Sequence, residues 1–150
     1  MTRIVLSTIS LHNVVGGLEK NIIYLANYLV DAGYTVELLT FDLPNSQSFY
    51  LLDKRIKWHC LGRSIPHQRV SFYERLLLII RIKKVLYQEN ACDVLISFQH
   101  GILLRLLLAV GLGNVKVICS ERNALTMYDY ISSSKWNLNF GLLLFVDKIT

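Results

Sequence analysis

The spacing of apolar positions near the start of the chain predicts a strand, a helix and a second strand. Residues 3–8 are apolar and partly β-branched, which is typical of a strand buried on both faces of a parallel sheet. Apolar side chains then recur at helical spacing on one face, at Leu18, Ile22, Leu25, Ala26 and Leu29. Gly33 follows where a glycine commonly ends a helix, and residues 34–41 resume a β-rich run. This order favours two parallel strands joined by a crossover helix.

The same alternation continues along the rest of the chain. We expect strands at residues 56–61, 93–98 and 115–120, and helices at residues 71–89 and 102–110. Ser71 and Glu74 have the spacing of a capping box, and Gly111 ends the helix before it. Residues 136–145 are predicted to form a last helix and residues 147–150 the entry to a sixth strand. The predicted fold class is α/β, with a parallel sheet flanked by helices.

Gly16 and Gly17 lie between the first predicted strand and the first predicted helix. Open parallel sheets bind ligands at this position. Glycines let a ligand approach the backbone, and the N–H groups of the first helical turn favour an anion such as phosphate. A plain tight turn would use the same two residues, so both interpretations remain open.

Other polar side chains are predicted at the same rim, because parallel strands end on one edge of a sheet. They are His12, Asn13, Asp42, His100, Glu121, Arg122 and Asn123. His100 could act as a base or bind a sugar hydroxyl, because imidazole titrates near neutral pH, or it could be a turn residue. Glu121 and Arg122 could bind a ligand or simply pair with each other. His59, inside a strand, is expected to pack.

The predicted helix at residues 71–89 combines apolar and basic side chains. The spacing places on one side Leu76, Ile79, Ile80, Lys83 and Leu86. Six of the sixteen basic residues lie in or just before this helix: Arg63, Arg69, Arg75, Arg81, Lys83 and Lys84. Such a helix could dock on an anionic bilayer, with Arg75, Arg81, Lys83 and Lys84 as the membrane-binding residues. It could equally cover the sheet with its apolar face while its basic side chains are solvated.

Composition narrows the class of protein. With 150 residues, 53% of them hydrophobic and 18% charged, the chain suits one domain with a substantial core and is not disordered. No apolar run approaches the ~20 residues of a membrane-spanning helix, and the run behind Met1 is too short for a secretory signal. The expected compartment is therefore the cytoplasm. The net charge of +5 would attract nucleic acid, anionic lipid or phosphorylated substrates alike.

Several other chemistries are disfavoured. The three cysteines are far apart in apolar surroundings and are predicted to be packed thiols, and no ligand spacing suggests a metal centre. Neither the Gly-x-Ser-x-Gly motif of hydrolases nor the Gly-Lys-Ser/Thr of P-loop proteins is present. Asp42 ends the second strand where a ribose-binding acid could sit, but the Gly-x-Gly-x-x-Gly fingerprint of dinucleotide-binding folds is missing.

The order of several segments resembles the amino-terminal domain of family-four retaining glycosyltransferases of the GT-B fold (group 1 type). Residues 16–20 read Gly-Gly-Leu-Glu-Lys where that family has Gly-Gly-Ala-Glu-Arg. Residues 25–29 fit its Leu-Ala-x-x-Leu, and residues 33–36 read Gly-Tyr-Thr-Val where it has Gly-His-x-Val. Residues 93–98 and 119–123 look like later strand ends in members that extend lipid-linked saccharides for capsule, lipopolysaccharide or glycoprotein assembly.

This resemblance implies a Rossmann-like domain that forms the acceptor side, one half of a GT-B fold. Residues 1–150 would be the amino-terminal domain, and a donor-binding domain with a Glu-x7-Glu motif is expected outside this sequence. Gly16 and Gly17 would lie beside the donor diphosphate. Further contacts to donor phosphate or acceptor are expected from Asn13, Glu121, Arg122 and Asn123. Many members carry a histidine where Glu121-Arg122-Asn123 stands here, which makes His100 the substitute catalytic candidate.

The implied function is transfer of a hexosyl or N-acetylhexosaminyl group from a nucleotide sugar to a lipid-linked or polysaccharide acceptor. The chain would be inactive without its donor-binding half and would lie in the cytoplasm or peripherally on the inner face of the cell membrane. Neither a metal nor another cofactor is expected, and nucleic acid is not an expected partner. The alternative is a non-catalytic, membrane-associated module that recruits a separate donor-binding subunit.

Overall fold

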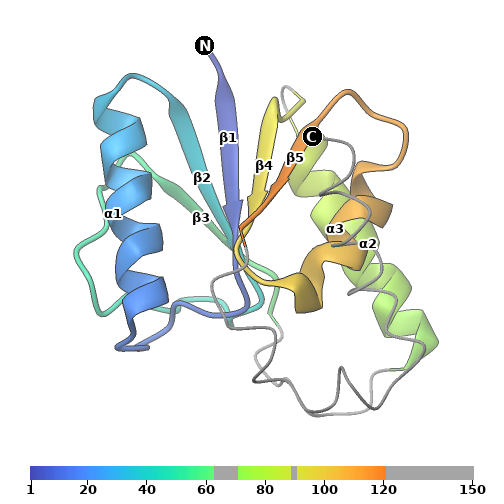
Figure 1. Cartoon of the computed structure of the whole chain (residues 1–150). Helices are drawn as coiled ribbons and strands as arrows, with labels where there is room; N and C mark the ends of the chain where they lie inside the picture. The colour runs from blue at the N-terminus through green and yellow to red at the C-terminus, as the bar shows by residue number, and fades with distance from the viewer. Residues whose placement is uncertain (63–70, 89–90, 121–150) are drawn as a thin grey trace.

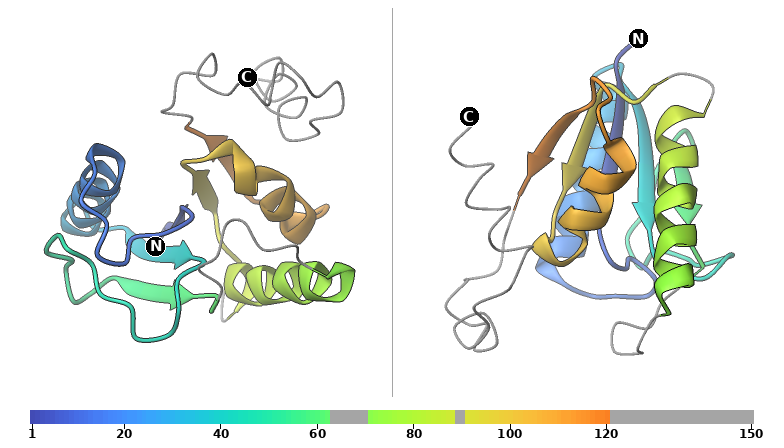
Figure 2. Two further views of the ribbon diagram at one scale, coloured as in Figure 1. Left: turned by 90° about the horizontal axis from the view of Figure 1, so that it is seen from below. Right: turned by 90° about the vertical axis from the view of Figure 1, so that its right-hand side faces the viewer.

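The computed structural model describes residues 1–62, 71–88 and 91–120, which form a parallel sheet between two layers of helices (Figure 1). Helix α1 covers one face of the sheet, and α2 and α3 cover the other (Figure 2). The elements are, in chain order, β1 (Arg3–Ser7), α1 (Gly17–Asp31), β2 (Thr35–Thr40), β3 (Lys57–Cys60), α2 (Phe72–Tyr87), β4 (Val94–Ser97), α3 (His100–Val110) and β5 (Lys116–Cys119). The predicted α/β class is confirmed.

The described strands have the order β3-β2-β1-β4-β5, and each neighbouring pair is parallel. Strand β1 is central, and at its last residue Ser7 aligns with Leu39 on β2 and Ser97 on β4. The chain first builds outward from β1 through β2 to β3, and then returns to the other side of β1. The order of the strands therefore reverses between β1 and β4, which is the point where such sheets bind ligands.

Alternate side chains of each strand supply two cores, because successive strand residues point to opposite faces. Leu6 and Leu38 lie in the core under α1, whose buried residues are Ile22, Ile23, Ala26 and Val30. Val5, Leu39 and Leu95 lie in the core under the other two helices, with the buried residues Leu78, Ile82, Val85 and Leu86 of α2 and Ile102, Leu106, Ala109 and Val110 of α3. The strands are apolar on both faces for this reason.

The amino-terminal end of β1 is fixed by a buried ionic cluster. Arg3 donates from Nε and Nη2 to the two carboxylate oxygens of Glu37, each at 2.9 Å, and His59 Nε2 donates to the same carboxylate at 2.6 Å. The guanidinium also donates to the carbonyl oxygens of Val85 and Leu86 at the end of α2, at 2.7 and 2.9 Å. Burial by itself would raise the pKa of Glu37, but the hydrogen bonds from His59 and Arg3 outweigh it and hold this pKa at about 2. His59 is thus a packing residue, as predicted.

Two further predictions hold and one needs correction. Gly33 follows the end of α1 with φ +91°, and Glu74 Oε2 accepts from the backbone N–H of Ser71 at 3.0 Å at the start of α2. Helix α3, however, starts at His100, two residues earlier than predicted. Gln99 keeps an extended backbone, with φ −146° and ψ 131°, and serves as the N-cap, so the helix follows β4 almost directly. The predicted helix at 136–145 and strand at 147–150 lie outside the described residues.

Candidate functional site

The loop between β1 and α1 lies at the carboxyl ends of the strands, and hydrogen bonds hold it from two sides. On one side, Oε1 of Gln99 accepts from the backbone N–H of Ile9 at 2.8 Å and from the hydroxyl of Thr8 at 3.1 Å. On the other side, the carboxylate of Asp42 accepts from the Ser10 hydroxyl at 2.5 Å and from the Leu11 N–H at 2.9 Å. The strand ends on both sides of β1 therefore fix the path of the loop.

The next part of this loop pairs with the segment after β2. His12 forms an antiparallel bridge with Ser48, and the Asn13 N–H donates to the Gln47 carbonyl at 3.0 Å. The Gln47 N–H in turn donates to Nδ1 of His12 at 3.1 Å. Nδ1 is thus an acceptor, and the proton of the neutral ring lies on Nε2. Asn13 has a left-handed backbone with φ +50°, which asparagine tolerates better than most residues.

Gly16 and Gly17 form the start of α1, and their surroundings differ. Gly16 is the N-cap, and its carbonyl accepts from Lys20 N at 3.1 Å and from the Tyr50 hydroxyl at 3.3 Å. A Cβ on Gly16 would collide with the Glu19 carboxylate, whereas a Cβ on Gly17 would meet nothing within 4 Å. Helix geometry leaves the N–H groups of Gly17, Leu18 and Glu19 without an intrahelical acceptor. The Gly17 side of this helix end is therefore open to a ligand.

The structure corrects the interpretation of Asp42. Its side chain is only 1% exposed, and both carboxylate oxygens hold the loop after β1. It cannot bind a ribose or serve as an exposed rim residue without releasing that loop. Asp42 is a structural support of the site, and the sequence alone could not distinguish this role from direct ligand binding.

Of the other residues predicted at the rim, the structure places the backbone of His100 there and does not describe Glu121, Arg122 and Asn123. His100 begins α3 at the rim, and the structure describes its backbone only. Glu121, Arg122 and Asn123 lie outside the described residues. The chain before them reaches the same rim, because Ser120 N donates to the Ser97 carbonyl at 2.7 Å. Sequence reasoning did not select Gln99, whose signal was its place between the end of β4 and the start of α3.

A buried hydroxyl lies just below this rim. Ser7 ends β1, is fully buried, and its Oγ has no hydrogen-bond partner among the described residues. Across the β1–β4 pairing, Ser97 Oγ donates to the Gln99 carbonyl at 3.1 Å. Buried polar groups without partners are uncommon, and they concentrate where a fold serves something other than stability.

The face that α2 presents differs from the predicted one. Its buried residues are Leu78, Ile82, Val85 and Leu86, so Leu86 points into the core while Leu76 and Ile80 are 46% and 54% exposed. The prediction that these three side chains lie on one side is wrong, because the face of α2 that packs on the sheet is the one that carries Leu78, Ile82 and Val85. The outer face carries the exposed apolar residues Phe72, Tyr73, Leu76 and Ile80 and the exposed basic residues Lys83 and Lys84. Arg75 and Arg81 are exposed too, but Arg75 lies seven residues before the buried Ile82, on the same side of the helix, and Arg81 turns toward the end of β3.

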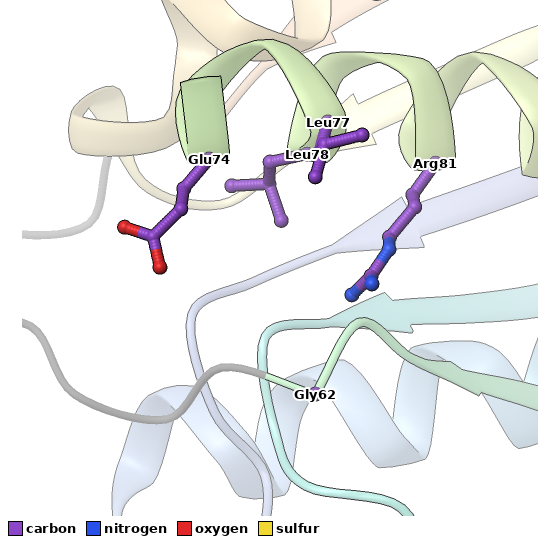
Figure 3. Close-up of a pocket in the computed structure, with 5 residues that line it drawn as sticks. All are labelled: Gly62, Glu74, Leu77, Leu78 and Arg81. Atoms are coloured by element: carbon purple, nitrogen blue, oxygen red, sulfur yellow. The ribbon is translucent and has the colours of Figure 1, made fainter. Parts of the chain in front are cut away.

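A pocket of about 340 Å³ lies between α2 and the turn after β3. Glu74 and Arg81 extend from the helix toward the turn at Gly62, with Leu77 and Leu78 between them (Figure 3). Arg81 also donates from Nη1 to the Leu61 carbonyl at 3.1 Å, so its guanidinium joins α2 to the end of β3. Of the four predicted membrane-binding residues, Arg81 thus has a structural contact as well.

The described residues offer little for metal or thiol chemistry. Within residues 1–62, 71–88 and 91–120, no group of three or more His, Cys, Asp or Glu side chains could hold a metal ion. Burial raises the pKa of the Cys60 thiol, and it raises the pKa of Cys92 to about 11. These two cysteines are packed thiols, as predicted. None of the described helices combines the length and apolar character that crossing a bilayer requires.

Comparisons with known proteins bear on the fold. No protein-family model matches the sequence, and no curated protein matches it significantly. Among solved structures, the chain is similar to sucrose-phosphate synthase from Thermosynechococcus elongatus, with a TM-score of 0.54 and 14% sequence identity. The match covers 90% of this chain and 36% of that one, so this chain spans about a third of the length of the enzyme it resembles. The similarity supports one half of a GT-B fold, and at this identity it shows the fold alone.

Proposed function

We propose that this chain is the acceptor-side half of a retaining, family-four glycosyltransferase, which transfers a hexosyl or N-acetylhexosaminyl group from a nucleotide sugar. The acceptor would be a lipid-linked or polysaccharide chain. Three findings support the proposal: the likeness to a sucrose-phosphate synthase, the glycine turn at the end of β1, and the reversal of strand order beside it. The donor-binding domain would be a separate part of the same polypeptide or another subunit.

The observation that carries the proposal is the environment of Gly17. Its backbone has no left-handed φ, and a side chain would have open space, so the folded chain does not need glycine there. Glycine also gives the unfolded chain more conformational freedom, which costs about 0.4–1 kcal/mol relative to alanine where alanine fits without strain. A ligand that approaches the backbone gives glycine a purpose at this position, because any side chain would occupy the ligand's place.

The chemistry follows from the amide groups at this turn. During sugar transfer, the bond between the sugar and the diphosphate breaks, and negative charge grows on the departing diphosphate. The N–H groups of Gly17 and Leu18, fixed in direction by the held loop, would stabilise that charge. The chain would also hold the acceptor hydroxyl on the face of the sugar that the diphosphate leaves, as retention requires, so that its oxygen bonds to the anomeric carbon and its proton passes to the departing diphosphate. Asn13, His100, Glu121, Arg122 and Asn123 are the proposed further contacts, with His100 as the catalytic candidate.

The test is sugar transfer by this chain together with its donor-binding half, supplied in the same polypeptide or as a separate subunit. We expect Gly17→Val to reduce transfer at least tenfold, the equivalent of about 1.4 kcal/mol at the transition state. The matched control is Ala32→Val, a substitution by the same side chain at an exposed residue that follows the other end of α1. Near-normal transfer by Gly17→Val would contradict the proposal.

A second candidate function rests on the outer face of α2. Four apolar side chains of this face, Phe72, Tyr73, Leu76 and Ile80, are 82%, 66%, 46% and 54% exposed, and Lys83 and Lys84 are exposed on the same face. Apolar side chains flanked by basic ones are typical of helices that lie on anionic bilayers. This face supports a peripheral membrane role, either for an enzyme with a lipid-linked acceptor or for a non-catalytic module that recruits a donor-binding subunit.

Vesicle sedimentation tests the membrane role. We expect the double variant Lys83→Glu and Lys84→Glu to lose binding to vesicles that contain anionic phospholipid, while binding to neutral vesicles stays low. The control makes the same charge change at exposed lysines elsewhere, with Lys54→Glu and Lys116→Glu. Equal losses in both variants would mean that net charge, and not this face, directs the chain to lipid.

A further inference from the structure

Gln99 lies at the point where the order of the strands reverses. It lies two residues after the end of β4, which is next to β1 in the sheet, and is half-buried at the carboxyl-end rim. It is the N-cap of α3, yet its side chain makes no capping hydrogen bond to that helix. The side chain reaches instead to the loop after β1, at Thr8 and Ile9.

The contact with Ile9 fixes the orientation of the Gln99 amide. A backbone N–H can only donate, so the side-chain atom that lies 2.8 Å from Ile9 N must be the oxygen. The Thr8 hydroxyl donates to the same oxygen at 3.1 Å. The Nε2 group therefore lies on the other side of the planar amide, away from this loop. It carries two N–H donors that have no hydrogen-bond partner among the described residues.

We propose that Gln99 binds ligand directly, by donating a hydrogen bond from Nε2 to a phosphate oxygen of the donor diphosphate. This inference rests on the proposed function, which brings a diphosphate to the carboxyl-end rim at Gly17. The same loop connects both groups: Gln99 holds its first residues, and Gly17 stands at its end. The Gln99 amide would thus hold the loop through its oxygen and the ligand through its nitrogen.

Substitution by glutamate separates this role from a structural one. Glutamate keeps acceptor oxygens for Thr8 and Ile9, so Gln99→Glu should hold the loop as well as the parent chain does. It has no N–H to donate, however, and places a negative charge beside the phosphate. If the Gln99 side chain lies away from the phosphate and only positions the loop, pyrophosphate binding should tolerate this change. If Gln99 binds the phosphate, it should not.

The experiment titrates the isotope-labelled chain with inorganic pyrophosphate at constant ionic strength, observed by NMR. In the parent chain we expect the Gln99 side-chain NH₂ signals to shift together with the amides of Gly17 and Leu18. In Gln99→Glu we expect the Ile9 amide signal to stay near its parent position while pyrophosphate affinity falls about tenfold or more, as for loss of one charge-assisted hydrogen bond. Gln88→Glu, at an exposed glutamine after α2, controls for the added charge.

The outcomes distinguish this inference from the function it rests on. If Gly17 and Leu18 respond but Gln99→Glu binds pyrophosphate like the parent chain, Gln99 only positions the loop and the inference is wrong. If the Gly17 and Leu18 amides do not respond at all, the diphosphate site itself is absent, and both proposals fail. If the Ile9 amide signal moves in Gln99→Glu, the loop has changed, and Gln99→Met is compared instead. Methionine can neither hold the loop nor donate to phosphate, so equal pyrophosphate affinity in Gln99→Met and the parent chain overturns the inference.

Discussion

The polar groups at the two ends of β1 differ in how completely they are hydrogen-bonded. At the amino end, Arg3, Glu37 and His59 form a closed cluster whose charged groups bind one another and the last carbonyls of α2. At the carboxyl end, the Ser7 hydroxyl and the Gln99 Nε2 group have no described partner, and a side chain at Gly17 would meet open space. One end is built for stability. The other keeps hydrogen-bonding capacity that the fold does not use, which is what a binding site requires.

The largest effect is expected at the closed end. Glu37→Ala leaves the buried Arg3 guanidinium without its carboxylate, and we expect the free energy of unfolding to fall by about 3–5 kcal/mol. Chemical denaturation measures this loss. The control is Asp53→Ala, which breaks an exposed ion pair with Arg55 and should cost far less. Equal losses would mean that the buried cluster contributes no more than a surface pair.

The same cluster predicts a pH dependence. The pKa of Glu37 is lowered to about 2 in the folded chain, so the unfolded chain binds this proton more readily. The stability that Glu37 contributes is therefore fully present above its ordinary pKa of 4.5 and is lost as the pH falls toward 2. We expect unfolding curves measured from pH 6 to pH 2 to show this loss in the parent chain. A Glu37→Gln variant with the same pH slope would contradict it.

A smaller effect is expected at Asp42, which holds the loop after β1. Asp42→Ala removes both acceptor oxygens and leaves the buried Leu11 N–H and the Ser10 hydroxyl without their acceptor, which should cost about 1–3 kcal/mol. Because the loop leads to Gly17, we expect pyrophosphate affinity to fall as well. Calorimetric unfolding and the NMR titration measure the two effects. Unchanged stability would show that Asp42 does not hold the loop.

At Gly17 itself, stability and binding are expected to move in opposite directions. Gly17→Ala places a methyl group in open space and improves helix propensity, so the chain should gain up to about 1 kcal/mol of stability. Pyrophosphate affinity should fall, because the methyl group lies where the ligand approaches. If the variant gains stability and keeps full pyrophosphate affinity, the proposal that the ligand approaches the Gly17 backbone is contradicted.

The smallest effect is expected at Ser7. Removing a buried hydroxyl that has no described partner leaves no other group unsatisfied, so we expect Ser7→Ala to raise the free energy of unfolding, by less than about 1 kcal/mol. Ser97→Ala is the comparison, since the Ser97 hydroxyl donates to the Gln99 carbonyl. Thermal unfolding of the two variants decides the order. A larger loss at Ser7 would mean that its hydroxyl has a partner in solution.

The sequence predicted the elements well because their causes are local. Apolar periodicity defined α1 and the strands, and Gly33 and the Ser71–Glu74 spacing marked helix ends that the structure reproduces. The inward face of α2 was misjudged, since an apolar helix with exposed leucines carries no clear stripe. The structural roles of Asp42 and Gln99 depend on contacts between residues more than thirty positions apart. Such contacts follow from topology and not from local pattern.

The measurement that tests the central claim most directly is the pyrophosphate titration of the labelled chain, comparing the two ends of β1. The account predicts that the amides of Gly17 and Leu18 shift first and furthest, while those of Arg3, Glu37 and His59 do not move. Shifts confined to the basic outer face of α2, around Lys83 and Lys84, would instead indicate attraction by net charge and contradict a diphosphate site at the carboxyl end of β1.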